Sequence, residues 1–170
     1  MANERAVRLT HSILFTLITL ASIVALAISA SLVANYNNYG YPPVNTNAYR
    51  DRIRICLAAS IWTTFIGLVL TVGFQVMGTK VAFGILTHLI PLIIAFILFI
   101  IGAGSLTALT NGTDCGSAEG GFDRCNIVKG LVAISWIDTI FVLLALIFVS
   151  VLAIKARGGF GARKSTLYDA

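Results

Sequence analysis

The sequence predicts an all-α integral membrane protein, an antiparallel four-helix bundle with both termini cytoplasmic. Of its 170 residues, 58% are hydrophobic and only 11% are charged, whereas soluble domains carry about 25% charged residues. Four apolar segments are each long enough to cross the roughly 30 Å hydrocarbon core of a bilayer as a helix. The twelve Lys and Arg residues lie almost entirely at the termini and between these segments. This pattern excludes a water-soluble protein and a nucleic-acid partner.

The first predicted span covers residues 9–34 and the second covers residues 53–77. The first run is 26 residues long, which exceeds the roughly 7–15-residue apolar core of a signal peptide, so we expect a retained anchor. Residues 35–50, which join the two spans, are rich in Tyr, Asn and Pro. Because Tyr favours the membrane–water interface, we interpret this segment as a loop lying on the bilayer, with a lateral contact surface as the alternative.

The third predicted span covers residues 81–109 and follows the short turn Gly78–Lys80. So short a connection places the second and third spans side by side in an antiparallel hairpin. Pro91 lies inside the third span and is expected to kink it, because proline removes one backbone donor. The fourth predicted span covers residues 127–154.

These spans form a single transmembrane domain over residues 1–155, and residues 156–170 are expected to be a flexible, basic cytoplasmic tail. Four spans place both termini on one side, which carries seven Lys and Arg residues against five on the other. The positive-inside rule therefore favours cytoplasmic termini. The opposite side carries a second loop with two cysteines and a glycosylation motif, which agrees with an extracellular or luminal position.

Cys115 and Cys125 lie in that second loop and are predicted to form a disulfide in an oxidising compartment. Closing a loop of this size stabilises the fold by about 3 kcal/mol in the chain-entropy model. Two free thiols are the alternative. Asn111 begins an Asn-Gly-Thr glycosylation motif, although its closeness to the membrane argues against glycan transfer. The loop contains no His and no CxxC pair, so no metal site is predicted.

Asp138 lies near the middle of the fourth span. An ionised group at that depth costs several kcal/mol unless it faces protein or water. Counting depth along the spans places hydroxyl groups at the same level, on Thr63 and Thr64 of the second span and on Ser22 and Thr19 of the first.

Our structural interpretation is that these hydroxyls hold a buried Asp138 and set the register of the bundle. The functional alternative is a proton or cation site. A transport site usually has a second ionisable group, and His88 lies more than two turns from the level of Asp138, so the structural interpretation is favoured. His88 is expected to be a polar packing residue near the cytoplasmic interface.

Small residues predict where helices approach closely. They recur every fourth position on the first two spans and also occur near the end of the third. The predicted packing residues are Ala21, Ala25, Ser29, Gly67 and Gly102. Large aliphatic residues on the third and fourth spans predict faces toward lipid or toward other subunits.

The chain contains no nucleophile elbow, phosphate-binding loop or paired-carboxylate motif. We therefore expect neither enzymatic activity nor a cofactor.

The layout, the two loop cysteines and the Ser-Trp-Ile-Asp stretch at Ser135–Asp138 resemble the MARVEL-domain tetraspan proteins, in particular the fungal members that organise plasma-membrane microdomains. Claudins and classical tetraspanins fit less well, because their cysteines are placed or numbered differently. The resemblance implies a non-enzymatic, self-associating tetraspan protein of the plasma membrane or secretory-pathway vesicles. Its implied partners are membrane lipids such as sterol or sphingolipid and further copies of itself. The alternative is a small transporter or channel component that uses Asp138 as an intramembrane proton or cation site.

Overall fold

Four long α-helices make up the computed structural model, which describes residues 2–42, 45–77, 85–115 and 124–156. In chain order they are α1 (Ala2–Tyr39), α2 (Thr46–Met77), α3 (Ile85–Thr110) and α4 (Cys125–Ala156). Each is long and apolar enough to cross a membrane. The described part of the chain is therefore all-α and has the dimensions of an integral membrane protein, as predicted.

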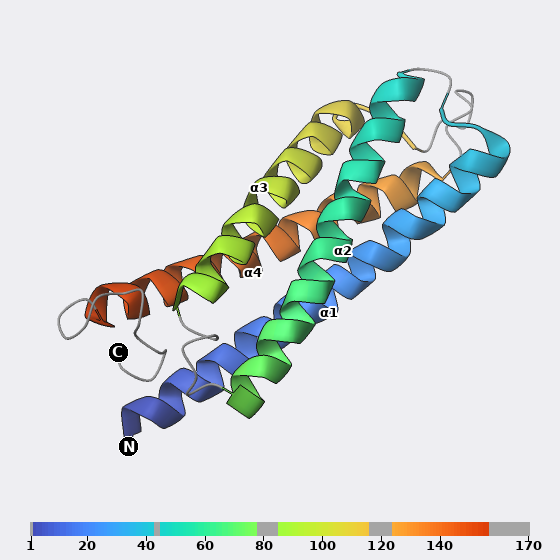
Figure 1. Ribbon diagram of the computed structural model, residues 1–170. Coiled ribbons are helices and arrows are strands. Elements are labelled where there is room, and N and C mark those ends of the chain that lie inside the picture. Colours follow the sequence, from blue (N-terminus) through green and yellow to red (C-terminus); the bar gives the residue numbers. More distant parts are fainter. Residues whose placement is uncertain (1, 43–44, 78–84, 116–123, 157–170) are drawn as a thin grey trace.

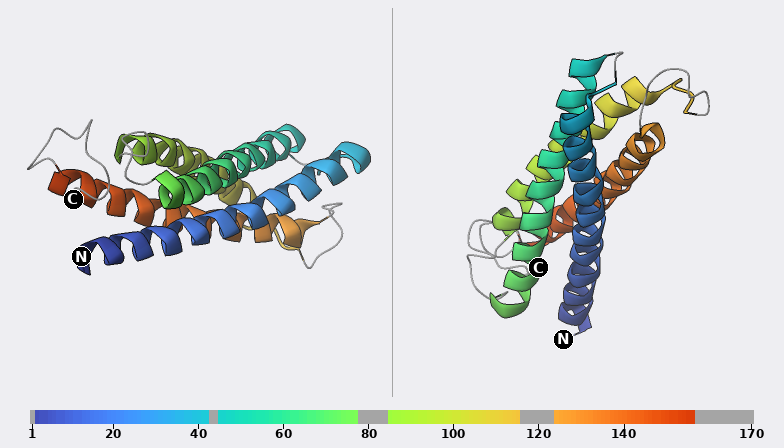
Figure 2. Two further views of the ribbon diagram at one scale, coloured as in Figure 1. Left: turned by 60° about the horizontal axis from the view of Figure 1, so that its bottom comes forward. Right: turned by 90° about the vertical axis from the view of Figure 1, so that its right-hand side faces the viewer.

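Each helix packs mainly against two neighbours, in the cyclic order α1, α2, α3, α4 and back to α1. The end of α1, the start of α2, the end of α3 and the start of α4 gather at one end of the molecule (Figures 1 and 2). We call this the loop end, and the opposite end the terminal end. In this ring α2 and α4 are diagonal to each other, as are α1 and α3.

Bonds between helices hold the loop end together. The Tyr49 hydroxyl of α2 donates to the Leu109 carbonyl at 3.1 Å, and Arg52 Nη1 donates to the Ser105 carbonyl at 2.7 Å. Both carbonyls lie on α3. The start of α2 is thereby tied to the end of α3.

The predicted loop over residues 35–50 is largely helical, because α1 continues to Tyr39 and α2 begins at Thr46. The reason is that two tyrosines of this segment are core residues: Tyr36 is 2% exposed and Tyr49 is 4% exposed. They pack inside the bundle, where a helix satisfies their backbone groups. The charged segment Asp51–Arg54 is also helical, with Ile53 buried and Asp51 and Arg54 exposed.

Other predicted features lie outside the described residues. These are the turn Gly78–Lys80, the first residues of the predicted third span and the tail beyond Ala156. Within α3, Pro91 occupies a helical position, and the Trp62 indole donates to its carbonyl at 3.2 Å. The kink at Pro91 stays a prediction.

The apolar core is divided into two clusters along the bundle. The terminal-end cluster includes Phe15, Ile18, Leu70, Leu92, Ala95 and Val142. The loop-end cluster includes Ala25, Tyr36, Tyr49, Cys56, Leu106 and Leu131. Along each of α1, α2 and α4, buried polar residues lie between the members of these two clusters. A polar layer therefore separates two apolar regions.

Candidate functional site

The polar layer is the candidate functional site. It consists of seven buried Ser, Thr and Asp side chains on three helices: Thr19 and Ser22 of α1, Ser60 and Thr63 of α2, and Ser135, Asp138 and Thr139 of α4. Ser and Thr are tolerated inside membrane helices because their hydroxyls can donate to a carbonyl one turn earlier. A carboxylate has no such local solution.

Several hydroxyls of the layer bond to their own helix. Thr19 donates to the Phe15 carbonyl at 2.7 Å, Ser60 to the Cys56 carbonyl at 2.8 Å, and Thr139 to the Ser135 carbonyl at 2.7 Å. These three donors are therefore committed to backbone carbonyls and are not available to Asp138.

One hydrogen bond of the layer joins two helices. Thr64 Oγ1 of α2 donates to Ser22 Oγ of α1 at 3.0 Å, and Ser22 Oγ in turn donates to the Thr19 carbonyl at 3.0 Å. Two predicted network residues, Ser22 and Thr64, are thus in direct contact. They link α1 to α2 without including the carboxylate.

Asp138 is 0% exposed, and neither of its carboxylate oxygens has a hydrogen-bond partner among the described residues. The predicted hydrogen bonds from Thr19, Ser22, Thr63 and Thr64 to Asp138 are not formed. Two causes are evident: α2 is diagonal to α4, and the α1 hydroxyls donate to their own backbone. Thr63 Oγ1 and Ser135 Oγ are likewise buried without a hydrogen-bond partner.

Close helix contacts occur at the predicted glycines. A Cβ atom built on Gly67 would lie 2.5 Å from Thr19 Oγ1, and one built on Gly102 would lie 2.9 Å from Cys56 Sγ. These contacts are at the α1–α2 and α2–α3 interfaces. The predicted small residues of α1, which are Ala21, Ala25 and Ser29, are all buried.

The structure also brings together the only two histidines of the sequence. His11 of α1 and His88 of α3 are both 0% exposed, and their ring centroids lie 5.2 Å apart. Phe15 stacks on His11 at 4.2 Å and meets His88 edge-on at 5.7 Å. His88 is thus a packing residue as predicted, but its partner His11 was missed.

One signal in the sequence points to His11. It precedes Phe15, Thr19 and Ser22 at helical spacing, so all four share one face of α1, and the other three are buried.

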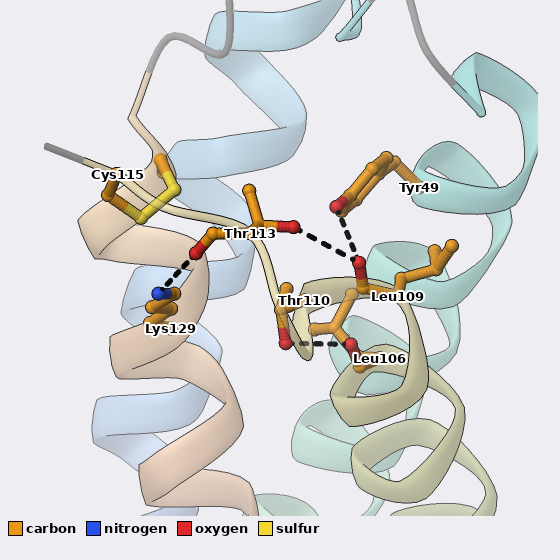
Figure 3. Close-up of a disulfide and its surroundings, with 8 residues drawn as sticks. Tyr49, Leu106, Leu109, Thr110, Thr113, Cys115 and Lys129 are labelled. Carbon is orange, nitrogen blue, oxygen red and sulfur yellow. Dashed lines mark hydrogen bonds between the residues drawn. A yellow bond between two sulfur atoms is a disulfide. The ribbon is translucent and has the colours of Figure 1, made fainter. Parts of the chain in front are cut away.

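At the loop end Cys115 and Cys125 form the predicted disulfide, with their Cα atoms 5.6 Å apart. It joins the segment after α3 to the first residue of α4 (Figure 3). Lys129 Nζ donates to the Thr113 carbonyl at 2.6 Å beside it. Asn111 is exposed in the turn that follows α3, and its glycosylation stays a prediction.

The described residues contain no group of three or more His, Cys, Asp or Glu side chains placed to hold a metal ion. The third cysteine, Cys56, is a free, buried thiol at the edge of the polar layer.

The fold and the polar layer together define a class, a four-helix integral membrane protein with an intramembrane carboxylate. Comparison with family models, with curated proteins and with solved structures found no match. The family and the function of the protein are therefore addressed below as proposals.

Proposed function

We propose that this protein is an antiparallel tetraspan membrane protein, related to the MARVEL type, that self-associates and organises membrane microdomains or vesicle membranes without enzymatic activity. In this proposal both termini are cytoplasmic, and the protein is located in the plasma membrane or in secretory-pathway vesicles. Its partners are membrane lipids and further copies of the chain.

The observation that carries the proposal is the outer surface of α3 and α4. Large aliphatic side chains there are exposed in the single chain: Ile93, Ile94, Ile97, Ile100, Ile101, Leu143, Leu144 and Ile147. In a membrane such faces contact lipid or the same faces of another copy. Most of the described chain belongs to the membrane spans. Its main interactions are therefore expected to be lateral contacts within the membrane, with lipid or with other copies of the chain.

The charge distribution and the disulfide support the proposed orientation. In the sequence, the segments expected on the side of the termini contain seven Lys and Arg residues against five on the other side, which favours cytoplasmic termini. The disulfide at the loop end is a bond that persists in oxidising compartments.

The mass of the assembly tests self-association. The protein would be extracted in mild detergent or placed in nanodiscs and measured by light scattering coupled to gel filtration. A defined oligomer is expected, and replacing Ile97 and Ile101 of α3 by Ala should reduce its size. The matched control replaces the buried Ala95 by Gly. A monomer in both detergent and nanodiscs would overturn self-association.

A small transporter or channel component is the second candidate, favoured by the carboxylate of Asp138 buried without a hydrogen-bond partner. Asp138→Asn separates the two candidates. Under the scaffold proposal the variant changes stability or assembly alone. Loss of a measured ion flux in an intact assembly would instead establish transport.

A further inference from the structure

The contact between His11 and His88 places two titratable rings inside the apolar terminal end of the bundle. Both side chains are 0% exposed, and their ring centroids lie 5.2 Å apart in an edge-to-face arrangement. Phe15 completes the group, stacked on His11 and edge-on to His88. Phe15 in turn belongs to an apolar core cluster with members on all four helices, including Leu70, Leu92 and Val149. We call the pair of rings the histidine contact.

The histidine contact joins two helices that are not neighbours in the bundle. Both α1 and α3 pack mainly against α2 and α4, and they are diagonal to each other. His11 and His88 therefore bring α1 and α3 together directly across the bundle. A change in this contact would alter how closely the two helices approach each other at the terminal end.

Both histidines lie close to the terminal-end border of the membrane spans. His11 is five residues after Ala6, where the first candidate span begins, and His88 is two residues after Leu86, where the third begins. At 1.5 Å per residue these separations are about 8 Å and about 3 Å along the helix axis. A proton from the water on this side therefore has a short path to either ring.

The charge of the two rings decides whether the contact is favourable. Neutral imidazole rings pack well as an aromatic pair. Imidazole titrates close to physiological pH, and two protonated rings at this separation repel each other, most strongly in apolar surroundings. The packed arrangement therefore has a lower affinity for a second proton than an arrangement in which the rings are apart.

Few other ionisable groups face the pair from the helices packed around it. On α1, Arg8 is exposed three residues before His11. The remainder of α3 contains no ionisable residue, and α2 contains none after Cys56. On α4 the carboxylate nearest in sequence to this end is Asp138, whose oxygens bond to neither ring. Further charged residues of α1 and α4 occur here in the sequence, with side chains outside the described ones: Glu4, Arg5 and Lys155.

We propose that the histidine contact is a proton-sensitive closure of the terminal end. With neutral rings, α1 and α3 are in contact there, and protonation of both rings separates them. A proton shifts such an equilibrium because it binds the two arrangements with different affinity. The separated arrangement holds more protons, so acidification favours it and a return to neutral pH restores the contact. This property goes beyond the scaffold function, because it concerns two helices of a single chain.

The distance between two spin labels tests the proposal. Leu9 and Leu86 are exposed at the terminal end and would be replaced by Cys in a Cys56→Ala background that keeps the disulfide. The protein would be studied by pulsed EPR in phosphatidylcholine nanodiscs, with labelled chains diluted by unlabelled ones. We expect the distance to lengthen reversibly between about pH 7.5 and about pH 5, an interval that brackets the usual titration of imidazole. The matched loop-end pair, at the exposed residues Asn38 and Ala108, should keep its distance.

Variants and ring signals assign the response. The double variant His11→Phe with His88→Phe keeps two aromatic rings without the charge, and its terminal-end distance should be the same at both pH values. Asp138→Asn is the matched control and should keep the full response. The chain contains two histidines, so ¹⁵N-histidine NMR of the unaltered protein follows both rings. Their signals should change from neutral to protonated over the same pH interval as the distance.

An unchanged terminal-end distance in the unaltered protein would overturn the proposal, whether or not the rings take up protons. So would a full response in the double Phe variant, or loss of the response in Asp138→Asn, since another group would then be the one that titrates. An equal lengthening at the loop end would indicate general opening of the bundle instead. Dilution of the labelled chains keeps this result separate from self-association, because the distance is measured within one chain.

Discussion

At the scale of single residues, Asp138 is the carboxylate buried in the polar layer. Four hydroxyls of the same layer donate to carbonyls of their own helix, those of Thr19, Ser22, Ser60 and Thr139. A carboxylate, in contrast, can only accept hydrogen bonds when ionised. Its two oxygens have no partner in the described chain. The buried carboxylate is therefore expected to lower the free energy of unfolding. Substitution of Asp138 tests this cost.

Asp138→Leu should stabilise the protein. Removing a buried polar group without a partner should raise the free energy of unfolding by about 1–3 kcal/mol. Unfolding in a mixed-micelle denaturation series measures the difference. A variant less stable than the unaltered protein would contradict this expectation.

Replacing both Cys115 and Cys125 by Ser should lower the free energy of unfolding by about 3 kcal/mol, through the entropy that the open segment regains when unfolded. The same denaturation series, run with and without reductant, checks this value. The double variant should no longer respond to reductant. A Cys56→Ala variant is the control, and it should keep the full response, since Cys56 is a free thiol.

At the scale of helices, the close approach of α1 and α2 depends on Gly67. Gly67→Ala would place a methyl group 2.5 Å from Thr19 Oγ1, so α1 and α2 must move apart or Thr19 must give up its bond to Phe15. The expected loss is about 1–3 kcal/mol of folding free energy, measured by denaturation.

Two glycines offer a matched control for that variant. Gly104 of α3 and Gly130 of α4 have nothing within 4 Å of an added Cβ. Gly104→Ala and Gly130→Ala should be neutral or stabilising by up to about 1 kcal/mol, because Ala favours the helix. If all three variants changed the folding free energy by the same amount, the close contact at Gly67 would not explain the loss in Gly67→Ala.

The histidine contact couples the diagonal helices α1 and α3. A double-mutant cycle with His11→Ala and His88→Ala should give a coupling energy of about 0.5–1.5 kcal/mol, as for other aromatic pairs. A cycle between His11 and Leu131, which lies on α4 in the loop-end cluster, serves as the reference. Additive effects of His11→Ala and His88→Ala would show that the two rings do not stabilise each other.

At the scale of the whole molecule, the two ends differ in chemistry. The loop end carries the disulfide and the Asn111 motif, and the sequence has seven Lys and Arg residues in the segments expected on the side of the termini against five on the other side. In intact cells, a cysteine introduced at Asn111 in a cysteine-free background should react with a membrane-impermeant maleimide. A cysteine introduced at Lys164 should react only after permeabilisation. The reverse pattern would invert the proposed orientation.

The sequence by itself determined that the chain forms membrane-length helices, and it determined the Cys115–Cys125 pair. Both follow from local facts, since the length and polarity of a run decide whether it can cross a bilayer and two cysteines in one short loop have few alternatives. The burial of Asp138 also follows from its place in an apolar run. These features do not depend on which helices are neighbours.

Tertiary structure alone decided which polar groups meet. Depth counting placed Thr63 level with Asp138 but could not show that α2 is diagonal to α4. Depth counting also placed His88 away from the level of Asp138, but it did not reveal that His11 lies beside His88. The Tyr, Asn and Pro content of residues 35–50 predicted a loop on the bilayer, although Tyr36 and Tyr49 are core residues. The physical reason is that hydrophobicity sets depth in a membrane, whereas the order and rotation of helices are set by side-chain packing between segments far apart in the chain.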